Sequence, residues 1–319
     1  MADLPASVTL HEEGPREGFQ IESSDIPTAR KVAFIEALAQ TGVRQIDCVS
    51  FVNPQRVPGM ADAAEVAAQI RKHDGVRYTG LWLNTKGLMR ALETPLDIVG
   101  AIRLTASETF CVKNTGMDIA QTVEEQRRWL DVYREKGIPV EWGYVMTAFG
   151  CNFEGYIDPR KVVSMVGQVL ELAAESAVSL RGVYLADTVG WGTPLSVERA
   201  IGAVRDRWPD LAIGLHLHDT RGTGLANAYA ALRLGVRQFD TTCAGLGGCP
   251  FAGHKGAAGN ICTEDMVFMC DEMGVATGID LEKLIECAHM AEEIVGHPLP
   301  GKVMRGGSLA RYRQLAGAQ

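Results

Sequence analysis

Two histidines in the second half of the chain are the residues best suited to bind a metal ion. His216 and His218 lie in the segment HLHD, at the end of the apolar run at residues 211–217. Such a run is typical of a β-strand, and side chains alternate along a strand, so both imidazoles are expected on one face. A hydrogen-bonded pair without an ion is the alternative, because two histidines at this spacing are a weak signal alone.

Two other motifs supply oxygen donors that would complete a metal site. Glu17 lies in GPREGFQ at residues 14–20, and Asn260 follows the glycine-rich GLGGCP at residues 245–250. A carboxylate, an amide oxygen and two imidazoles suit an octahedral divalent ion, Mg²⁺ or Mn²⁺, with Zn²⁺ as the alternative. Taken alone, Glu17 would be a solvated loop charge and Asn260 a turn residue. Their expected location beside the two histidines favours metal ligation.

Arg16 and Cys249 are candidates for the catalytic steps. The guanidinium of Arg16, next to a metal ligand, could stabilise an enolate or carboxylate oxygen as charge develops. A salt bridge to Glu12 or Glu13 is its alternative role. Cys249 lies among glycines whose permissive backbones suit a loop that closes over substrate, so its thiol could transfer a proton. An incidental thiol in a flexible turn is the alternative for Cys249.

Composition and charge exclude several classes of protein. Of 319 residues, 46% are hydrophobic and 22% are charged, as in ordinary globular proteins. The net charge of −8 provides no excess positive field for a nucleic acid or an anionic membrane. No apolar stretch reaches the length of a membrane span, and residues 1–5 lack the features of a signal peptide. Eight scattered cysteines without a Cys-x-x-Cys motif are expected to be reduced, in a cytoplasmic protein.

Short β-rich runs alternate with segments of helical period in eight βα units, which predicts an α/β fold of the (β/α)₈ TIM-barrel type. An open doubly wound sheet is less consistent, because the first turn lacks a Gly-x-Gly-x-x-Gly pattern. We expect one domain over residues 1–319, with the barrel at about 7–275 and a C-terminal helical extension at about 276–319. The expected strands cover residues 7–11, 45–51, 78–83, 98–104, 140–146, 182–186, 212–216 and 238–242. The expected helices cover residues 27–40, 61–72, 85–92, 119–136, 159–176, 195–208, 222–234, 264–274 and 281–295.

The barrel fold would bring the three motifs together. Active sites of such barrels lie on the loops at the carboxyl ends of the strands. The motifs follow the first, seventh and eighth strands, which become neighbours when the barrel closes. Residues far apart in the sequence are therefore expected around one cavity.

Ordered motifs recur at seven of the eight predicted strand ends. They are GPREGFQ at 14–20, SFV at 50–52 with Pro58, ASE at 106–108, GC at 150–151 with EG at 154–155, DTVG at 187–190, HLHDT at 216–220 and GLGGCP at 245–250. Over about residues 8–284 the chain thereby resembles the 3-hydroxy-3-methylglutaryl-CoA lyase family. The resemblance implies a metal-dependent retro-Claisen cleavage that releases acetyl-CoA and an oxo acid.

The resemblance also implies a role for each matched residue. His216, His218 and Asn260 are similar to metal ligands, and Arg16 is similar to the group that stabilises the enolate. Cys249 is similar to the loop cysteine, and either its thiol or His216 would supply the acid that protonates the enolate carbon. The expected partner is an acyl-CoA thioester, bound to a homo-oligomer, with a dimer expected.

Further polar groups are expected around the substrate. The residues that the resemblance implies are Gln20, Asp47, Ser107, Asp187 and Thr188. The base that removes the hydroxyl proton would be Asp187 or Glu17, and the choice between them stays open. The CoA phosphates need cations, for which the candidates are Lys113, Arg221 and Lys255.

Three departures from the family pattern bear on the substrate. Glu17 stands where the lyases have aspartate, and Asp47 stands where they have glutamate, although related homocitrate synthases do use Arg-Glu-Gly. The stretch at residues 249–260 is two residues longer than the usual pattern, and residues 21–23 lack a lysine. We expect cleavage of a thioester like 3-hydroxy-3-methylglutaryl-CoA. The alternatives are citramalyl-CoA as substrate, a Claisen-condensing synthase of the homocitrate or isopropylmalate type, and a non-catalytic acyl-CoA-binding relative.

Overall fold

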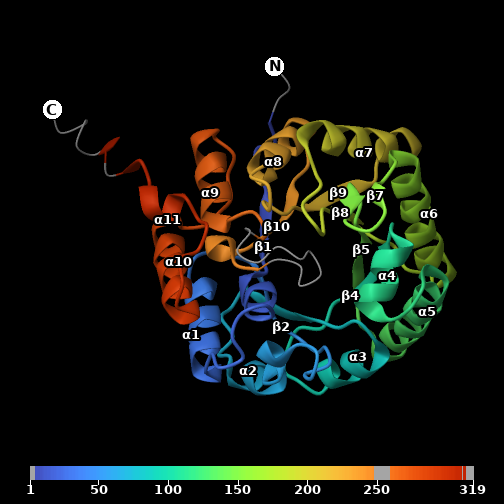
Figure 1. Cartoon of the computed structure of the whole chain (residues 1–319), viewed down its shortest axis with the longest axis horizontal. Coiled ribbons are helices and arrows are strands. Elements are labelled where there is room, and N and C mark those ends of the chain that lie inside the picture. The colour runs from blue at the N-terminus through green and yellow to red at the C-terminus, as the bar shows by residue number, and fades with distance from the viewer. Residues whose placement is uncertain (1–3, 248–258, 311, 314–319) are drawn as a thin grey trace.

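Eight parallel strands form one curled sheet in the computed structural model, which describes residues 4–247, 259–310 and 312–313. Viewed as in Figure 1, the strands form an inner ring with helices outside it, so the expected (β/α)₈ barrel is confirmed. The hydrogen-bonded order is β3-β2-β1-β10-β9-β8-β5-β4. The strands are β1 Thr9–Glu12, β2 Gln45–Ser50, β3 Arg77–Leu81, β4 Gly100–Thr105, β5 Val140–Met146, β8 Gly182–Ala186, β9 Ala212–His216 and β10 Gln238–Thr241.

The two end strands of the sheet, β3 and β4, are joined through the residue pair Tyr78 and Asp97. The Asp97 backbone N–H donates to Tyr78 O at 2.7 Å. In return the Tyr78 N–H donates to Asp97 Oδ2 at 2.9 Å. These bonds satisfy backbone groups that a ladder would otherwise pair, in the segment that leads into β4.

The helices surround the sheet and follow the expected order. The eight that follow the strands are α1 Thr28–Ala39, α2 Ala63–Gln69, α3 Thr85–Leu92, α5 Ile119–Lys136, α6 Pro159–Glu175, α7 Pro194–Arg207, α8 Gly224–Arg233 and α9 Thr263–Glu272. Local signals set several ends: Asp118 forms a capping box at the start of α5, and Gly137 ends that helix at a positive φ. The helical extension contains α10 Leu281–Val295 and α11 Val303–Gly306, which lie beside α1 and α9 in Figure 1.

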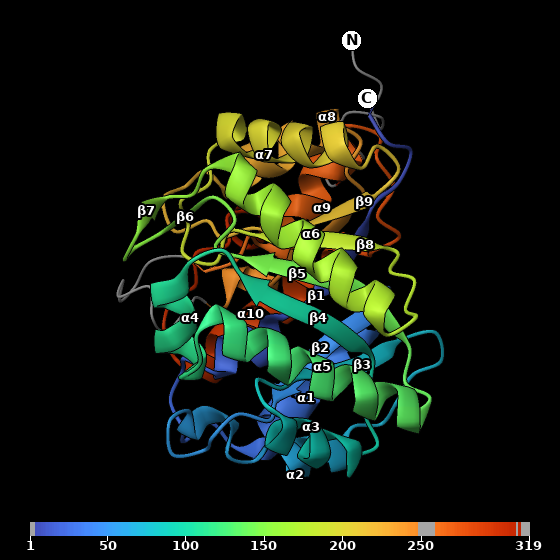
Figure 2. The same cartoon turned by 90° about the vertical axis from the view of Figure 1, so that its right-hand side faces the viewer.

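Several short elements at the carboxyl ends of the strands were not expected. They are the π-helix η1 Gly14–Gly18, helix α4 Glu108–Thr115, the hairpin of β6 Gly150–Cys151 and β7 Gly155–Tyr156, and the 3₁₀ turns η2 Pro58–Met60 and η3 Cys243–Gly245. In Figure 2, β4 and β5 point toward the edge where α4, β6 and β7 lie. These elements therefore build the end of the barrel where the sequence places the site.

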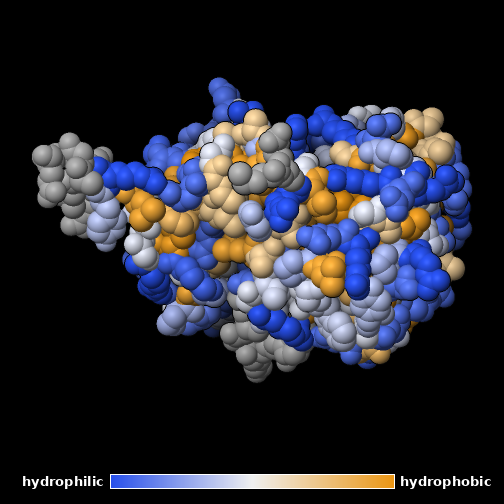
Figure 3. Space-filling view, turned by 90° about the horizontal axis from the view of Figure 1, so that it is seen from above, coloured by the Kyte–Doolittle hydropathy of each residue, from blue (hydrophilic) through white to orange (hydrophobic). Residues whose placement is uncertain are grey.

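No helix in the described ranges is both long enough and apolar enough to cross a membrane. Over α7 and α8 the surface is largely hydrophilic, with small hydrophobic areas (Figure 3). Leu195 and Tyr229 are exposed apolar residues of these two helices. Isolated apolar residues of this kind are usual on a protein surface.

Glu12, the last residue of β1, ties together the loops that carry the site. Its Oε1 accepts from the N–H groups of Gly14 at 2.8 Å and Cys243 at 2.9 Å. Its Oε2 accepts from the Thr263 hydroxyl at 2.6 Å. Burial raises the pKa of Glu12 to about 7, although these hydrogen bonds act in the opposite direction. One carboxyl group thus fixes η1 and η3 to the start of α9.

Replacement of Glu12 should therefore cost stability. Glu12→Ala leaves two buried N–H groups without an acceptor, so we expect the free energy of unfolding in urea to fall by about 2–5 kcal/mol. The control is Glu198→Ala on the exposed face of α7, which should change it by less than about 0.5 kcal/mol. Equal effects of the two variants would mean that Glu12 does not hold the loops.

Candidate active site

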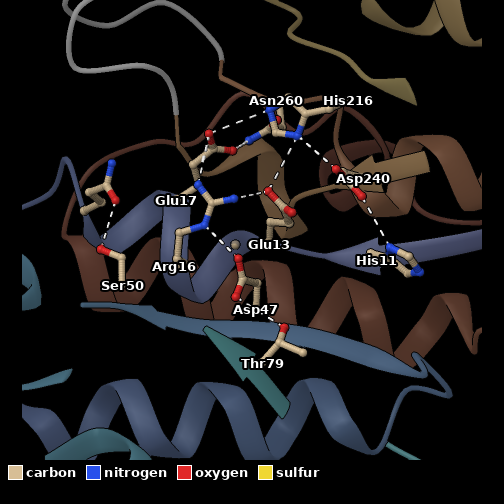
Figure 4. Close-up of polar contacts among 12 residues, drawn as sticks. His11, Glu13, Arg16, Glu17, Asp47, Ser50, Thr79, His216, Asp240 and Asn260 are labelled. Atoms are coloured by element: carbon tan, nitrogen blue, oxygen red, sulfur yellow. Dashed lines mark hydrogen bonds and ion pairs between the residues drawn. The ribbon is translucent and has the colours of Figure 1, made fainter. Parts of the chain in front are cut away.

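Glu17, His216 and His218 converge at the carboxyl end of the barrel, with Asn260 beside them. Nε2 of His216 lies 3.2 Å from Nε2 of His218. Oε1 of Glu17 lies 3.8 Å from the first of these nitrogens and 3.9 Å from the second. Asn260 Nδ2 donates to Glu17 Oε2, as Figure 4 shows. The structure thus brings together all four residues that the sequence proposed as ligands.

The arrangement of these donors fits a divalent ion. Three ligand atoms from Glu17, His216 and His218 lie within 4.8 Å of one another. Ligands about 2.1 Å from one centre are about 3.0–3.4 Å apart in octahedral or tetrahedral geometry, so only small shifts would be needed. The Asn260 Oδ1 atom is buried and has no hydrogen-bond partner among the described residues. An unpartnered buried oxygen is costly, and an ion would supply its partner.

A second layer of acidic groups supports His216. Its Nδ1 lies 3.2 Å from Asp240 Oδ2 and 3.6 Å from Glu13 Oε2. Asp240 also contacts His11 Nδ1 at 3.4 Å, so this carboxylate bridges two imidazoles. A proton on Nδ1 that is donated to Asp240 would leave Nε2 of His216 with its lone pair toward the cluster.

Charge in this buried site favours a cation. Burial lowers the pKa of His216, but Glu17 and Asp240 outweigh that effect and raise the pKa to about 9. Burial raises the pKa of Glu17, but Arg16 and His216 outweigh it and lower the pKa to about 2. Burial lowers the pKa of His218 to about 4, so this imidazole is neutral at pH 7. Glu17 is ionised and His218 has a free lone pair, as metal ligands require.

Arg16 is fixed by three carboxylates. Its Nη2 donates to Glu13, its Nε donates to Asp47 Oδ2 at 3.0 Å, and its Nη1 lies 3.4 Å from Glu17 Oε1. Of the alternatives raised from the sequence, the salt bridge is therefore to Glu13 and not to Glu12. This salt bridge coexists with a position beside the proposed ligands Glu17 and His216 (Figure 4), so a structural contact and a catalytic role do not exclude each other.

The described residues line an inner cavity and an outer groove at this end of the barrel. An inner cavity of about 150 Å³ is lined by Glu13, Arg16, Glu17, Gln20, Asp47, Leu81, Leu83, Arg103, Phe110, Asn114, Tyr144, Met146, Ala186, Thr188, His216 and Asp240. An outer groove of about 640 Å³ is lined by Gln20, Ile21, Glu22, Ser24, Val52, Asn53, Arg56, Val57, Pro58, Gly59, Leu83, Asn84, Asn114 and Thr115. Gln20, Leu83 and Asn114 line both, so the groove adjoins the inner cavity.

Three of the expected substrate-binding residues line the inner cavity. Gln20 Oε1 accepts from the Ser50 hydroxyl at 3.1 Å. Asp47 holds Arg16 and accepts from Thr79 Oγ1 at 3.3 Å. Thr188 lines the cavity, and its Oγ1 accepts a hydrogen bond from the Thr147 N–H at 2.9 Å.

Ser107 and Asp187 have local structural partners. The Ser107 hydroxyl caps α4 by accepting from Phe110 N, and it donates to Cys151 Sγ at 3.0 Å. Asp187 accepts from the backbone N–H groups of Trp191 and Gly192 at 2.7 and 2.9 Å. Burial raises the pKa of Asp187 to about 6. Neither residue lines the inner cavity as defined above.

Two of the expected residues, Cys249 and Lys255, lie outside the described residues. Of the other phosphate candidates, Lys113 is exposed and its Nζ lies 4.9 Å from the centre of the Phe153 ring. Arg221 donates to the carbonyl of Gly190 at 2.6 Å. Neither lines the outer groove.

Known proteins are similar to this chain in sequence and in fold. The sequence profile of the family described as HMGL-like matches residues 7–291. The chain belongs to the HMGL-like family. It is 38% identical, over 98% of its length and 88% of the relative's, to the cytoplasmic 3-hydroxy-3-methylglutaryl-CoA lyase of Rattus norvegicus. The family resemblance and the assignment as a carbon–carbon lyase are thereby confirmed.

Solved structures of HMGL-like relatives superpose on the chain. The HMG-CoA lyase of Bacillus subtilis matches with a TM-score of 0.87 at 35% identity, covering 95% of this chain and 98% of that chain. The HMG-CoA lyase of Acinetobacter baumannii, in complex with coenzyme A and 3-methylmalate, also has a TM-score of 0.87, at 37% identity over 97% of this chain and 98% of that chain.

Sequence reasoning about this HMGL-like protein missed three charged residues of the inner cavity, Glu13, Arg103 and Asp240. Arg103 lies between Ile102 and Leu104, and a charge between apolar residues of a strand is a usable signal of a buried site. Glu13 and Asp240 have polar neighbours in the sequence and carry no such signal. The sequence does not say what any of the three contacts, because the contacting residues come largely from other strands.

Metal affinity should depend on pH in a defined direction. In the metal-free protein His216 carries a proton below its pKa of about 9, and an ion must displace it. We therefore expect the dissociation constant for Mn²⁺, measured by titration calorimetry, to fall by up to about tenfold per pH unit from about pH 6.5 to about pH 8.5. A pH-independent dissociation constant would contradict binding through His216.

Proposed function

We propose that this chain is a divalent metal-dependent lyase that cleaves 3-hydroxy-3-methylglutaryl-CoA to acetyl-CoA and acetoacetate. The observation that carries the proposal is the cluster of Glu17, His216, His218 and Asn260 with Arg16 beside it, at the edge of the inner cavity. The names of the relatives support this substrate. Mg²⁺ or Mn²⁺ is the proposed ion, because the donor set mixes oxygen and nitrogen without thiolate.

The ion, held by Glu17, His216, His218 and Asn260, would act as a Lewis acid that lowers the pKa of the tertiary hydroxyl. Loss of the hydroxyl proton turns this oxygen into a carbonyl, and the C2–C3 bond breaks with its electron pair moving to the thioester enolate. Arg16 stabilises the negative oxygen of that enolate. A proton then adds to the enolate carbon, which completes acetyl-CoA.

The base and the acid follow from the charges of the site. Asp187, with a pKa near 6, is better matched to proton removal than Glu17, whose pKa is about 2. Glu17 instead lies at the cluster itself, so we propose Glu17 as ligand and Asp187 as base through a bridging water. Cys249 or His216 would supply the returning proton.

The outer groove is the proposed site for the coenzyme arm. It adjoins the inner cavity through Gln20, Leu83 and Asn114, and it is large enough for an extended chain. Arg56 on its wall is a cation for the phosphates, in addition to the sequence candidates. We also propose a cytoplasmic homodimer with one catalytic domain over residues 1–319.

Chelation tests the proposal directly. Treatment with EDTA should abolish cleavage of 3-hydroxy-3-methylglutaryl-CoA, and Mn²⁺ or Mg²⁺ should restore it, with acetyl-CoA and acetoacetate as products by mass spectrometry. His218→Ala should lose bound metal in elemental analysis. Citramalyl-CoA belongs in the same assay, because faster cleavage of this thioester would replace the proposed substrate while retaining the mechanism. Full activity of metal-free protein would remove the metal from the mechanism.

Loss of Arg16 should affect the chemical step. Arg16→Gln removes the charge that meets the enolate oxygen, so kcat should fall by at least about 10²-fold with a smaller change in KM. Steady-state kinetics with saturating metal measure both constants. Arg199→Gln on α7 is a control that should leave them unchanged, since Arg199 is exposed and lies outside both cavities. A change in KM alone would make Arg16 a substrate anchor.

A further inference from the structure

Arg103 places a guanidinium without a charged partner in the wall of the inner cavity. It lies on β4, and its side chain lines the inner cavity. Its Nη1 atom is buried and has no hydrogen-bond partner in the described part of the chain. Among the residues that the structure describes, Arg103 forms no ion pair.

The other charges of the inner cavity all have partners. Arg16 meets three carboxylates, as described above, and Asp240 meets His11 and His216. Asp47 is close enough to Arg103 for its pKa to respond to that charge, yet its hydrogen bonds go to Arg16 and Thr79. Within this cavity the unmatched charge is therefore that of Arg103.

Two aromatic rings hold the guanidinium of Arg103. Its centre lies 5.2 Å from the centre of the Tyr144 ring and 5.9 Å from that of the Trp82 ring. Such rings attract a cation but offer no acceptor in the plane of its N–H groups. A planar guanidinium whose N–H groups lack acceptors is suited to a carboxylate, which can accept two parallel hydrogen bonds. A buried cationic donor without an acceptor costs free energy until such a group binds.

We propose that Arg103 is a specificity-determining residue that binds the free carboxylate of the acyl group. The order of the strands places β4 across the barrel from β10, and the cluster of Glu17, His216 and His218 lies on the side of β1 and β9. An acyl group in the inner cavity therefore has its reacting carbon at the cluster and its charged end at Arg103. This subsite would select thioesters that have a second, anionic carboxyl group. The inference rests on the proposed lyase function and specifies its substrate class.

The test compares two thioesters that differ only in charge. They are 3-hydroxy-3-methylglutaryl-CoA and its analogue with a neutral carboxamide in place of the free carboxylate. Arg103→Met keeps an unbranched side chain between Tyr144 and Trp82 but removes the charge. It should lower kcat/KM for the carboxylate by about 30-fold or more, and for the amide by less than about threefold. Arg103→Lys should recover part of the loss.

Binding gives a second measurement that does not need turnover. Calorimetry with Mn²⁺-loaded protein should show that Arg103→Met weakens the binding of 3-hydroxy-3-methylglutarate by about 30-fold or more and leaves the affinity of its uncharged diamide unchanged. The matched control is Arg77→Met at the start of β3, at the other end of the barrel from the site. It breaks an ion pair with Glu141 and should leave the affinities of both ligands unchanged.

The outcomes separate this inference from the proposed function. If the wild-type protein cleaves the carboxylate thioester and Arg103→Met lowers both thioesters equally, the role of Arg103 is structural and the subsite is wrong. If Arg103→Met changes neither, the carboxylate binds elsewhere. If the wild-type protein cleaves neither thioester, the proposed function fails, and the calorimetric comparison still decides whether Arg103 binds a carboxylate.

Discussion

Buried negative charge at the carboxyl end of the barrel is the constraint on which the rest of the site depends. Four carboxylates, those of Glu13, Glu17, Asp47 and Asp240, line one cavity that is largely screened from water. Burial alone would keep them protonated, and it does raise the pKa of Glu13 to about 8. At Glu13 the neighbouring charges of Asp240 and Asp47 add to burial, whereas at Glu17 the charges of Arg16, His216 and His218 outweigh burial and lower the pKa to about 2. These buried carboxyl groups are therefore stable in the ionised form only where cations lie at fixed positions beside them.

The barrel could be predicted from the sequence because its signals are local. Alternation of apolar runs and helical periods gave β5, β8, β9, α3, α5 and α10 with the bounds that the structure shows. The π-helix Gly14–Gly18 has no such signal. It lies where the Glu12 carboxylate accepts hydrogen bonds from both Gly14 and Cys243, which is more than two hundred positions away. The pattern of a short segment cannot predict such a long-range contact.

The candidate site also contains both residues that local sequence patterns indicate and residues that they do not. The four proposed ligands could be recognised because residue type, spacing and strand ends all indicated them, and the structure brings them together. Asp240 and Arg103 are single charges within β10 and β4, and their importance depends on the parallel register that turns them into the barrel. Asp240 meets His11 and His216, and Arg103 lies beside the rings of Tyr144 and Trp82. These contacts come from other elements, so the pattern of one segment could not indicate them. Cys249 falls outside the described residues, and its proposed role stays a prediction.

Two arginines of one cavity are suited to different tasks by their partners. Arg16 already shares its charge with three carboxylates, so an anionic substrate gains little from it before reaction. It is rigidly oriented, however, and a preoriented donor stabilises charge that appears only in the transition state. Arg103 has no such partners, and its charge is available to a carboxylate in the ground state. Arg103 on β4 would then bind the substrate carboxylate, and Arg16 beside β1 would stabilise the enolate oxygen. A change at Arg103 would therefore alter substrate preference without loss of the chemical step.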